Sequence, residues 1–427
     1  MNQALALKKL KGIKPKGVKV RDQTKFEQLF NLAKIVMSGF NQVKPNKFLD
    51  ITFKQNFDVV YDQVKSVSDF SKNDLETFVL SLSGDIEDHS ENTFSDIYFD
   101  DNKKYVLGLF TGALLTVLTK RNIKQNKKTI INIDGNNQRF DYLFAGARQV
   151  DQLVLKNFKG EGIGQHLAAF DGCANLVKFS NLKGNSILFR SAYGGNMDIL
   201  HVEEIKGDTC IYGVASNKGS ANLVIAKNIE GSLVGAHLAN DGGKVKLLLI
   251  EDVLGDEILG GLYSQYLDKT FIDLVISRRV GKKILEDSHP FKGLTYKLAS
   301  DLLYFEDSDP TEIENMKWAR FFHASTRSCD FIISTACNNA SLDLDFFGFL
   351  ENNNLNIYSS KFGRGDLIEE YYGYFYGKSS DMSRFKSKLK QKNIPELLSV
   401  INTIKGNDYE FLLNQANKIK QIVKYNK

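Results

Sequence analysis

The stretch LVLKNFKG at residues 153–160 recurs four more times along the chain and decides the fold. It returns as VKFSNLKG at 177–184, LHVEEIKG at 200–207, VIAKNIEG at 224–231 and LLIEDVLG at 248–255. Together with Gly135, the glycines that close these stretches are spaced 25, 24, 23, 24 and 24 residues apart. A fixed period of this length is typical of a solenoid, in which one structural unit stacks on the next.

Alignment on these glycines produces apolar columns seven, five and two positions before each glycine and three positions after it, with alanine at the eighth position after four of them. The first two columns have the period of two that places side chains on one face of a strand. The alternation then breaks, which indicates a corner, and glycine turns corners without a Cβ penalty. The pattern predicts a parallel β-helix of about six coils, right-handed by the general preference of parallel crossovers.

A leucine-rich repeat has a similar period, but its asparagine stands three residues after the last strand leucine. Here the asparagine comes two residues after, as in Leu155 to Asn157. The sequence also leaves no room for a helix between the short strands. The polar column three positions before the glycines therefore reads as a ladder of side-chain hydrogen bonds at a turn: Asn157, Asn181, Glu204, Asn228 and Asp252.

Helical periodicity flanks the repeat, so the predicted fold is mainly β with α-helical caps at both ends. We divide the chain into a basic arm (1–21), a helical region with the solenoid cap (22–128), the β-helix (129–277) and a mixed, mostly helical region (278–427). The apolar run 106–118 predicts the cap helix, and Asn73 with Glu76 resembles a capping box. Residues 331–337 look β-like, and two helices follow Pro395, the second opened by Asn407 and Glu410.

Composition indicates an ordinary globular protein of 427 residues, with 42% hydrophobic and 25% charged residues. Four cysteines without metal-ligand spacing predict neither a disulfide framework nor a metal site, and we predict no cofactor. The N-terminus shows no secretory signal, and the apolar run is too short to span a bilayer. We expect a cytoplasmic protein without a membrane span.

In outline, this order of helices, β-helix and helical region resembles the scaffold proteins of the sulfur-mobilisation iron–sulfur assembly system. The resemblance covers architecture and length, and no motif of that family stands in the C-terminal region. It implies an intracellular scaffold and assigns no residue.

One polar column stands six positions after the glycines, outside the core and the ladder. It begins with Asp141, His166 and Arg190, which coil stacking would bring together. An acid, an imidazole and a guanidinium in a row suit anion binding or acid–base chemistry, whereas the alternative is a surface row of ion pairs. His237 lies three coils from His166, too far to share a metal.

Basic and aromatic residues near the C-terminus form a second candidate site. Tyr372 and Tyr374 lie in YYGYFYG, just before Arg384, Lys386 and Lys388. Such residues grip phosphates and stack bases. Against this reading, the whole chain carries a net charge of only +5, and tyrosines also favour protein interfaces.

The sequence therefore predicts first a non-catalytic scaffold whose solenoid binds a protein partner. The alternative is a nucleic-acid-binding protein that uses the basic and aromatic segments. An enzyme or small-anion binder at Asp141, His166 and Arg190 is the third hypothesis, and the sequence does not identify a small-molecule ligand.

Overall fold

The computed structural model describes residues 24–39, 50–67, 69–83, 101–255, 258, 270–280, 298–306, 329–335, 356–359 and 394–425. Helices α2 (Lys25–Gly39), α3 (Asp50–Val64), α4 (Lys72–Leu82) and α6 (Asp101–Lys124) come first, and α11 (Ile394–Thr403) and α12 (Tyr409–Tyr425) come last. Between them lie β1 (Ile130–Arg139), β2 (Gln149–Lys159), β3 (Cys173–Lys183), β4 (Asn196–Lys206), β5 (Ser220–Glu230), β6 (Lys244–Leu254), β7 (Thr270–Arg278), β8 (Leu298–Glu306), β9 (Cys329–Thr335) and β10 (Asn356–Ser359).

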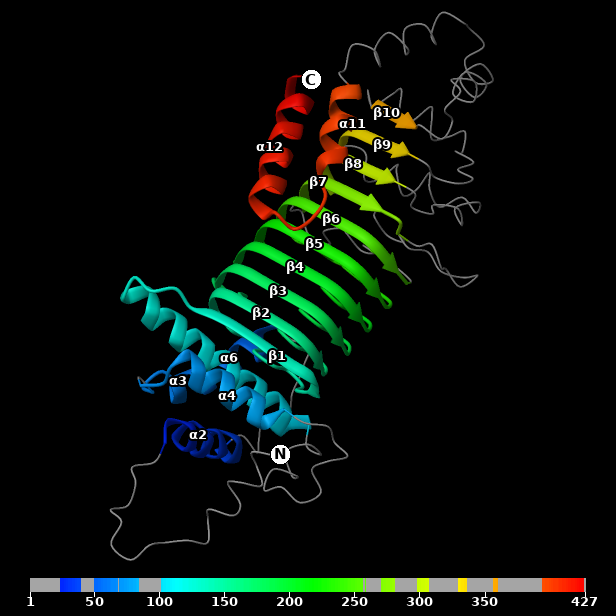
Figure 1. Cartoon of the computed structure of the whole chain (residues 1–427). Helices are drawn as coiled ribbons and strands as arrows, with labels where there is room; N and C mark the ends of the chain where they lie inside the picture. The colour runs from blue at the N-terminus through cyan, green and yellow to red at the C-terminus, as the bar shows by residue number, and fades with distance from the viewer. Residues whose placement is uncertain are drawn as a thin grey trace, which may run out of the picture.

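The strands form one parallel sheet whose spatial order is the chain order. The repeat sets the register, because Leu153 pairs with Val177, Val177 with Leu200, and the same column continues to Leu248. Figure 1 shows the stacked strands with the first helices at the β1 end and the last two beside the later strands. The predicted parallel β-solenoid of about six turns, with helices at both ends, is confirmed. Between residues 130 and 255, all of which are described, no helix interrupts the coils.

Apolar side chains fill the interior of each coil as the columns predict. In the column five positions before the glycines, for example, Leu155, Phe179 and Val202 are fully buried. A further inward column, ten positions before the glycines, was not predicted: Val150, Ala174, Met197, Ala221 and Val245. Its small and medium side chains complete the cross-section of the core.

The corner before each glycine is formed by the ladder residue, and the glycine lets neighbouring coils approach. Asn157 has a φ of 57° and Asn181 a φ of 50°, the left-handed conformation that turns the strand. Gly184 has a φ of 145°, and a Cβ there would lie 1.9 Å from the carbonyl oxygen of Gly160. Steric contact between stacked backbones therefore requires the glycine column.

The predicted ladder of side-chain hydrogen bonds is present at the N-terminal end. Asn181 Nδ2 donates to Asn157 Oδ1 at 2.7 Å, and Asn157 Nδ2 donates to Asp134 Oδ1 at 2.8 Å. At the other end, Arg279 Nε donates to Asp252 Oδ1 at 2.7 Å. These bonds satisfy polar groups at the corner from one coil to the next.

The remaining part of each coil is a turn segment with a four-residue pattern of two inward and two outward side chains. In the third coil, Ile187 and Leu188 lie in the core, Phe189 and Arg190 lie outside it, and Ala192 returns to it. Every second residue has positive φ, and its amide donates alternately to the next and the preceding coil. His166 N donates to Phe189 O, whereas Ala168 N donates to Ala147 O.

The first coil differs from the others in register. Gly160 N donates to Lys183 O, and the equivalent bond in the first coil is made by Phe140 N to Lys159 O. The pairing of β1 with β2 shifts between Asp134 and Gln138, which moves the corner past Gly135. Phe140, and not Gly135, is therefore the equivalent of the later corner glycines.

Helix α6 covers the open end of the first coil. In that coil the amides of Phe144 and Arg148 point away from the second coil, and they donate to the hydroxyl oxygens of Thr111 and Thr116, both at 3.0 Å. Gly112 permits this approach, because a Cβ there would lie 2.1 Å from Ala145 O. The threonines replace the carbonyl oxygens of a missing coil, so α6 acts as the cap that the apolar run predicts.

The apolar length of α6 reflects burial inside the protein. Within the described residues it is the one helix long and apolar enough to be a candidate membrane span, and 78% of its apolar window is buried. On α4, the capping box is formed by Ser71 and Asp74, not by Asn73 and Glu76. Glu76 instead accepts a bond from Asn132 N on the free edge of β1, at 3.0 Å.

The C-terminal helices pack on the outer face of the sheet and form a second apolar core. Strands β5, β6 and β7 present leucine and isoleucine outward as well as inward. The outward residues of the strands are Leu223, Ile225, Leu247, Leu249, Leu274 and Ile276. They pack in one cluster with the apolar residues of the C-terminal helices: Leu397, Val400, Ile401, Ile404, Leu412, Ala416, Ile419 and Ile422. Both helices were predicted after Pro395, although Asp408 caps α12 through the amide of Phe411. Beyond residue 277 the sheet continues with β8, β9 and β10.

Candidate functional site

The outward side chains of the turn segments form one continuous surface along the solenoid, which we call the turn face. Its aromatic and polar members stand five, six, nine and ten positions after the corner residues: His166, Phe170, Phe189, Arg190, Tyr193, Tyr212 and His237. The helix α3 covers the N-terminal part of the turn face. On this surface His166 is buried, whereas Tyr193, Tyr212 and His237 remain half-buried.

A carboxylate from α3 joins two of the predicted site residues. Asp50 Oδ1 lies 3.0 Å from His166 Nε2 and 2.5 Å from Arg190 Nη1. The coil repeat places His166 and Arg190 on adjacent coils, as predicted. The acid that joins them comes from Asp50, at the start of α3, and not from Asp141.

Aromatic rings enclose His166. The ring of Phe53 on α3 stacks on it at 4.0 Å between centroids, and Phe170 stacks at 5.6 Å. His166 is only 1% exposed, and its Nδ1 has no hydrogen-bond partner. His166 is therefore a buried contact between the solenoid and α3.

The electrostatics of this contact follow from its burial. Burial lowers the pKa of His166 below 6.5, although the bond with Asp50 opposes that shift. Burial also raises the pKa of Asp50, but the bond from His166 and the charge of Arg190 outweigh it, so this pKa lies below 3.8. Burial raises the pKa of Tyr193 to about 12. At neutral pH the contact consists of an ionised carboxylate, a neutral imidazole and a guanidinium.

Beyond α3, the turn face continues as a row of rings on the third, fourth and fifth coils. Phe189 stacks on Tyr212 at 5.0 Å with an interplanar angle of 10°, and Tyr212 lies 4.9 Å from His237. The Arg190 guanidinium lies over the rings of Phe189 and Tyr193, at 5.3 and 5.5 Å. Tyr193, Tyr212 and His237 are half-buried, so part of each side chain is exposed to solvent.

Asp141 does not belong to the polar column in which the sequence placed it. Because Phe140 is the first corner, Asp141 is equivalent to Glu161, and the position equivalent to His166 is Gly146. Asp141 binds Arg139, at 2.9 Å, and its Oδ1 accepts from the amide of Glu161 at 2.9 Å. The predicted row of Asp141, His166 and Arg190 is therefore wrong in its first member.

The second predicted site lies outside the described residues: Tyr372, Tyr374, Arg384, Lys386 and Lys388. So does the basic arm 1–21. Two basic residues near the end of α6 bind the N-terminal helical region. Lys120 donates to the Tyr61 hydroxyl at 3.2 Å, and Arg121 donates to the carbonyl of Phe70. Both also lie over the rings of those residues. These two cations hold the N-terminal helices together.

A second buried histidine lies on the outer face of the sheet, at the start of α12. His201 Nδ1 lies 2.8 Å from the Tyr409 hydroxyl, and its Nε2 lies 3.2 Å from Glu203. Lys178 binds the same carboxylate at 2.9 Å. Burial lowers the pKa of His201 to about 4, so His201 is neutral when it holds Tyr409.

The sequence did not point to the residues of α3 and the ring row. Asp50 and Phe53 lie more than a hundred residues before His166, and no periodicity relates them to the repeat. The ring row carries a short signal in the sequence, because Phe189 and Tyr212 stand five positions after Gly184 and Gly207, whereas His237 stands six positions after Gly231.

No metal-binding group of three or more His, Cys, Asp or Glu residues occurs within the part of the chain that the structure describes. Comparison with known proteins finds no matching family model, no matching curated protein and no matching solved structure. The function must therefore be argued from the geometry of this chain.

Proposed function

We propose that the protein is a non-catalytic cytoplasmic scaffold that binds a protein partner along the turn face of its solenoid. The observation that supports this proposal is the row of Tyr193, Tyr212 and His237 beside Arg190. Tyrosine and arginine are enriched where protein interfaces gain most of their binding energy. Rigid stacking of these rings between coils lowers the entropy that binding costs.

The geometry favours binding over catalysis. Asp50 is bound to both His166 and Arg190, and Phe53 covers the imidazole. A general base needs access to the proton that it removes, and here the imidazole contacts protein on both sides.

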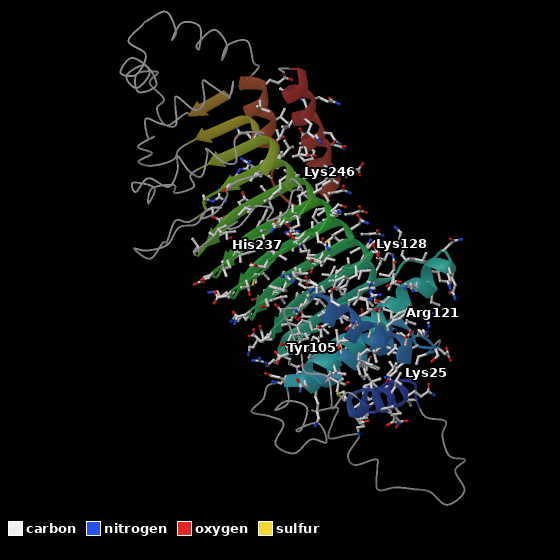
Figure 2. The ribbon with its side chains drawn as sticks, turned by 180° about the vertical axis from the view of Figure 1, so that it is seen from behind. Lys25, Tyr105, Arg121, Lys128, His237 and Lys246 are labelled. Carbon is white, nitrogen blue, oxygen red and sulfur yellow. The ribbon has the colours of Figure 1, made fainter. Side chains whose placement is uncertain are left out.

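The test is co-purification of the tagged full-length protein from its own cells at low salt, with and without nuclease. We compare the natural sequence with the double variant Tyr193→Ala and Tyr212→Ala, and with Lys246→Ala as a matched surface control. Lys246 is exposed on β6, well apart from His237 on the solenoid (Figure 2).

We expect a partner protein that resists nuclease, is lost from the double variant and is retained by Lys246→Ala. Partners that vanish with nuclease in all three proteins would contradict the proposal and favour nucleic-acid binding. Circular dichroism of each variant checks that the fold persists.

A further inference from the structure

The C-terminal helices form a layer with an apolar core of its own. Buried residues of α11 and α12 pack in one cluster with the outward side chains of β5, β6 and β7, and a different cluster joins the coil interiors to the N-terminal helices. Figure 1 shows the two helices lying together beside the later strands, at the end of the chain. Because proteins open locally in contiguous units that often coincide with such motifs, the helix pair can open while the coils stay folded.

One of the polar links between this layer and the sheet is made by an imidazole. Other links are made by the cationic side chains of Arg278, Lys227 and Lys420. At the start of α12, however, the Tyr409 hydroxyl lies 2.8 Å from His201 Nδ1, and the two rings meet edge to face at 5.7 Å between centroids. Imidazole is the side chain that ordinarily changes its charge between pH 5 and pH 8. A change in pH therefore acts on this link.

The surroundings of His201 disfavour a positive charge on the docked imidazole. The ring is 0% exposed. Among the described residues, the titratable and charged groups that face it are Tyr409 from α12, Glu203 from its own strand, Lys178 from β3 and Lys227 from β5. Glu203 lies 3.2 Å from His201 Nε2, but it also binds Lys178 at 2.9 Å. The two lysines and the loss of water thus oppose the single carboxylate.

Docking of α12 and protonation of His201 therefore compete. Burial lowers the pKa of the docked imidazole to about 4, while Glu203 opposes this shift and Lys178 and Lys227 add to it. When α12 moves away, the ring meets water and its pKa returns toward the ordinary 6.5. The released form thus takes up a proton that the docked form does not. Docking is fully stable above pH 6.5 and weakens progressively as the pH falls toward 4.

We propose that α11 and α12 are an acid-released cover of the sheet: when His201 takes up a proton, the two helices leave as one unit, the coils stay folded, and the outer face of β5, β6 and β7 is uncovered. That face is apolar and includes Leu223, Leu247 and Leu274. The inference goes beyond the proposed scaffold function and does not depend on it, because it concerns the outer face of the sheet and not the turn face.

Hydrogen exchange of the full-length protein, followed by mass spectrometry between pH 7.5 and pH 5, tests the inference. The exchange rates are converted to protection factors, which removes the intrinsic dependence of exchange on pH. The natural protein is compared with His201→Gln and with His166→Gln. The second variant is the matched control, because His166 is also a buried imidazole, 1% exposed, but lies at the contact with α3.

We expect peptides of α11 and α12 to be less protected than those of β2 and β3 at every pH. Between pH 7.5 and pH 5 their protection should fall about thirtyfold, as pKa values of 6.5 in the released form and about 4 in the docked form require. This fall should be lost in His201→Gln and unchanged in His166→Gln. Binding of the dye ANS should rise over the same range in the natural protein, because an apolar face is uncovered.

Equal protection of the helices and the coils, or a reduced pH effect in His166→Gln as well, would overturn the proposal, because the helices would then open only when the whole molecule unfolds. A pH effect that persists in His201→Gln would overturn it by assigning the release to another group. If α12 fails to dock in His201→Gln, an NMR titration of the imidazoles in the natural protein decides. The proposal requires the docked His201 to stay unprotonated down to pH 5, and protonation near pH 6.5 with the helices still docked would overturn it.

Discussion

At the residue scale, the glycine column shows how stacking limits the choice of side chain. Gly184 and Gly194 both have positive φ, at 145° and 63°, but their surroundings differ. A Cβ on Gly184 would meet the backbone of Gly160, whereas the nearest atom to a Cβ on Gly194 is 3.5 Å away. Replacement by alanine at Gly184 therefore tests steric conflict together with backbone strain, whereas replacement by alanine at Gly194 tests backbone strain alone.

We expect Gly184→Ala to lower the free energy of unfolding by about 3 kcal/mol or more, because coils would have to separate locally. Gly194→Ala should cost about 1 kcal/mol, for its backbone conformation alone. Urea denaturation followed by circular dichroism measures both. Equal losses in the two variants would show that the coils can separate without cost.

Two buried histidines should make the protein less stable in acid. Burial lowers the pKa of both His166 and His201 below 6.5 in the folded protein, to about 4 for His201. As the pH falls below 6.5, the unfolded chain takes up protons that the folded chain does not. The stability present above pH 6.5 is therefore lost progressively toward the folded pKa.

We expect the melting temperature to fall between pH 7.5 and pH 5, and to fall less in His166→Gln and in His201→Gln. The groups that face His166 are Asp50, Arg190 and Tyr193. The range stays above 3.8, where protonation of Asp50 would begin to remove its own contribution. An unchanged slope in both variants would contradict the assignment of the acid sensitivity to these imidazoles.

At the scale of elements, α6 shows how a helix can end a solenoid. Thr111 and Thr116 accept the amides of Phe144 and Arg148, whereas Thr119 is equally buried and its hydroxyl has no partner. Replacing Thr111 or Thr116 by valine leaves a buried amide unsatisfied. Each change should cost about 1–3 kcal/mol.

Thr119→Val is the matched control, and it should be neutral or stabilising because it removes an unsatisfied hydroxyl without changing shape. Thermal denaturation of the three single variants measures the difference. The capping role would be wrong if Thr119→Val were as damaging as the other two.

One buried arginine adds a polar link to the apolar contact between the C-terminal helices and the sheet. Arg278, 1% exposed, donates to the carbonyls of Ile404 at 2.6 Å and Ile401 at 3.0 Å, at the C-terminal end of α11. A cation at this end satisfies the last carbonyls and complements the helix dipole. Arg278 therefore attaches α11 to β7.

We expect Arg278→Met to raise hydrogen exchange across α11 and α12 while coils two to four stay protected. Arg279→Met is the control, because the Arg279 side chain is 38% exposed and binds Asp252, away from the helix carbonyls. Equal exchange in the two variants would show that apolar packing alone holds the helices.

The sequence was informative about the elements that repeat and silent about those that do not. The inward columns seven, five and two positions before the glycines, and three and eight positions after them, were predicted correctly, because stacking places the same kind of side chain in the same environment in each coil; the column ten positions before the glycines was not predicted. Gly135 was misread as a corner because the shift in β1 leaves a glycine by chance near the expected spacing. The docking of α3 through Asp50 could not be predicted, since a single contact between distant segments leaves no periodic pattern.

The apolar outer columns of the later strands carried a signal that the repeat obscured. The outward column that begins with the polar Gln152 on β2 becomes apolar on the later strands, where it continues with Leu223, Leu247 and Leu274. A strand that is apolar on both faces must be covered on both. That change marks where α11 and α12 pack.

At the scale of the whole molecule, each coil is stabilised mainly by its two neighbours. A destabilising substitution in a middle coil should therefore uncouple the unfolding of the coils on its two sides. Val202 is fully buried on β4, and Val202→Asp places a charge in the core at a cost of several kcal/mol. We expect loss of the cooperative melting transition.

Lys183→Asp, at an exposed position of β3 that pairs with Lys159 and Lys206, is the control and should melt like the natural protein. Limited proteolysis of Val202→Asp should cut first within β4 and its turns. If this variant melts normally, the inward register assigned to β4 is incorrect.

The threonine contacts of α6 also bear on how molecules meet one another. An uncovered end of a solenoid presents unpaired backbone amides and carbonyls to which the edge strand of another molecule can add, so it can start a fibre. Here the amides that would recruit another molecule already donate to Thr111 and Thr116. Glu76 likewise occupies an amide on the edge of β1. The helices at this end thus occupy amides through which another molecule would otherwise pair with the first coil.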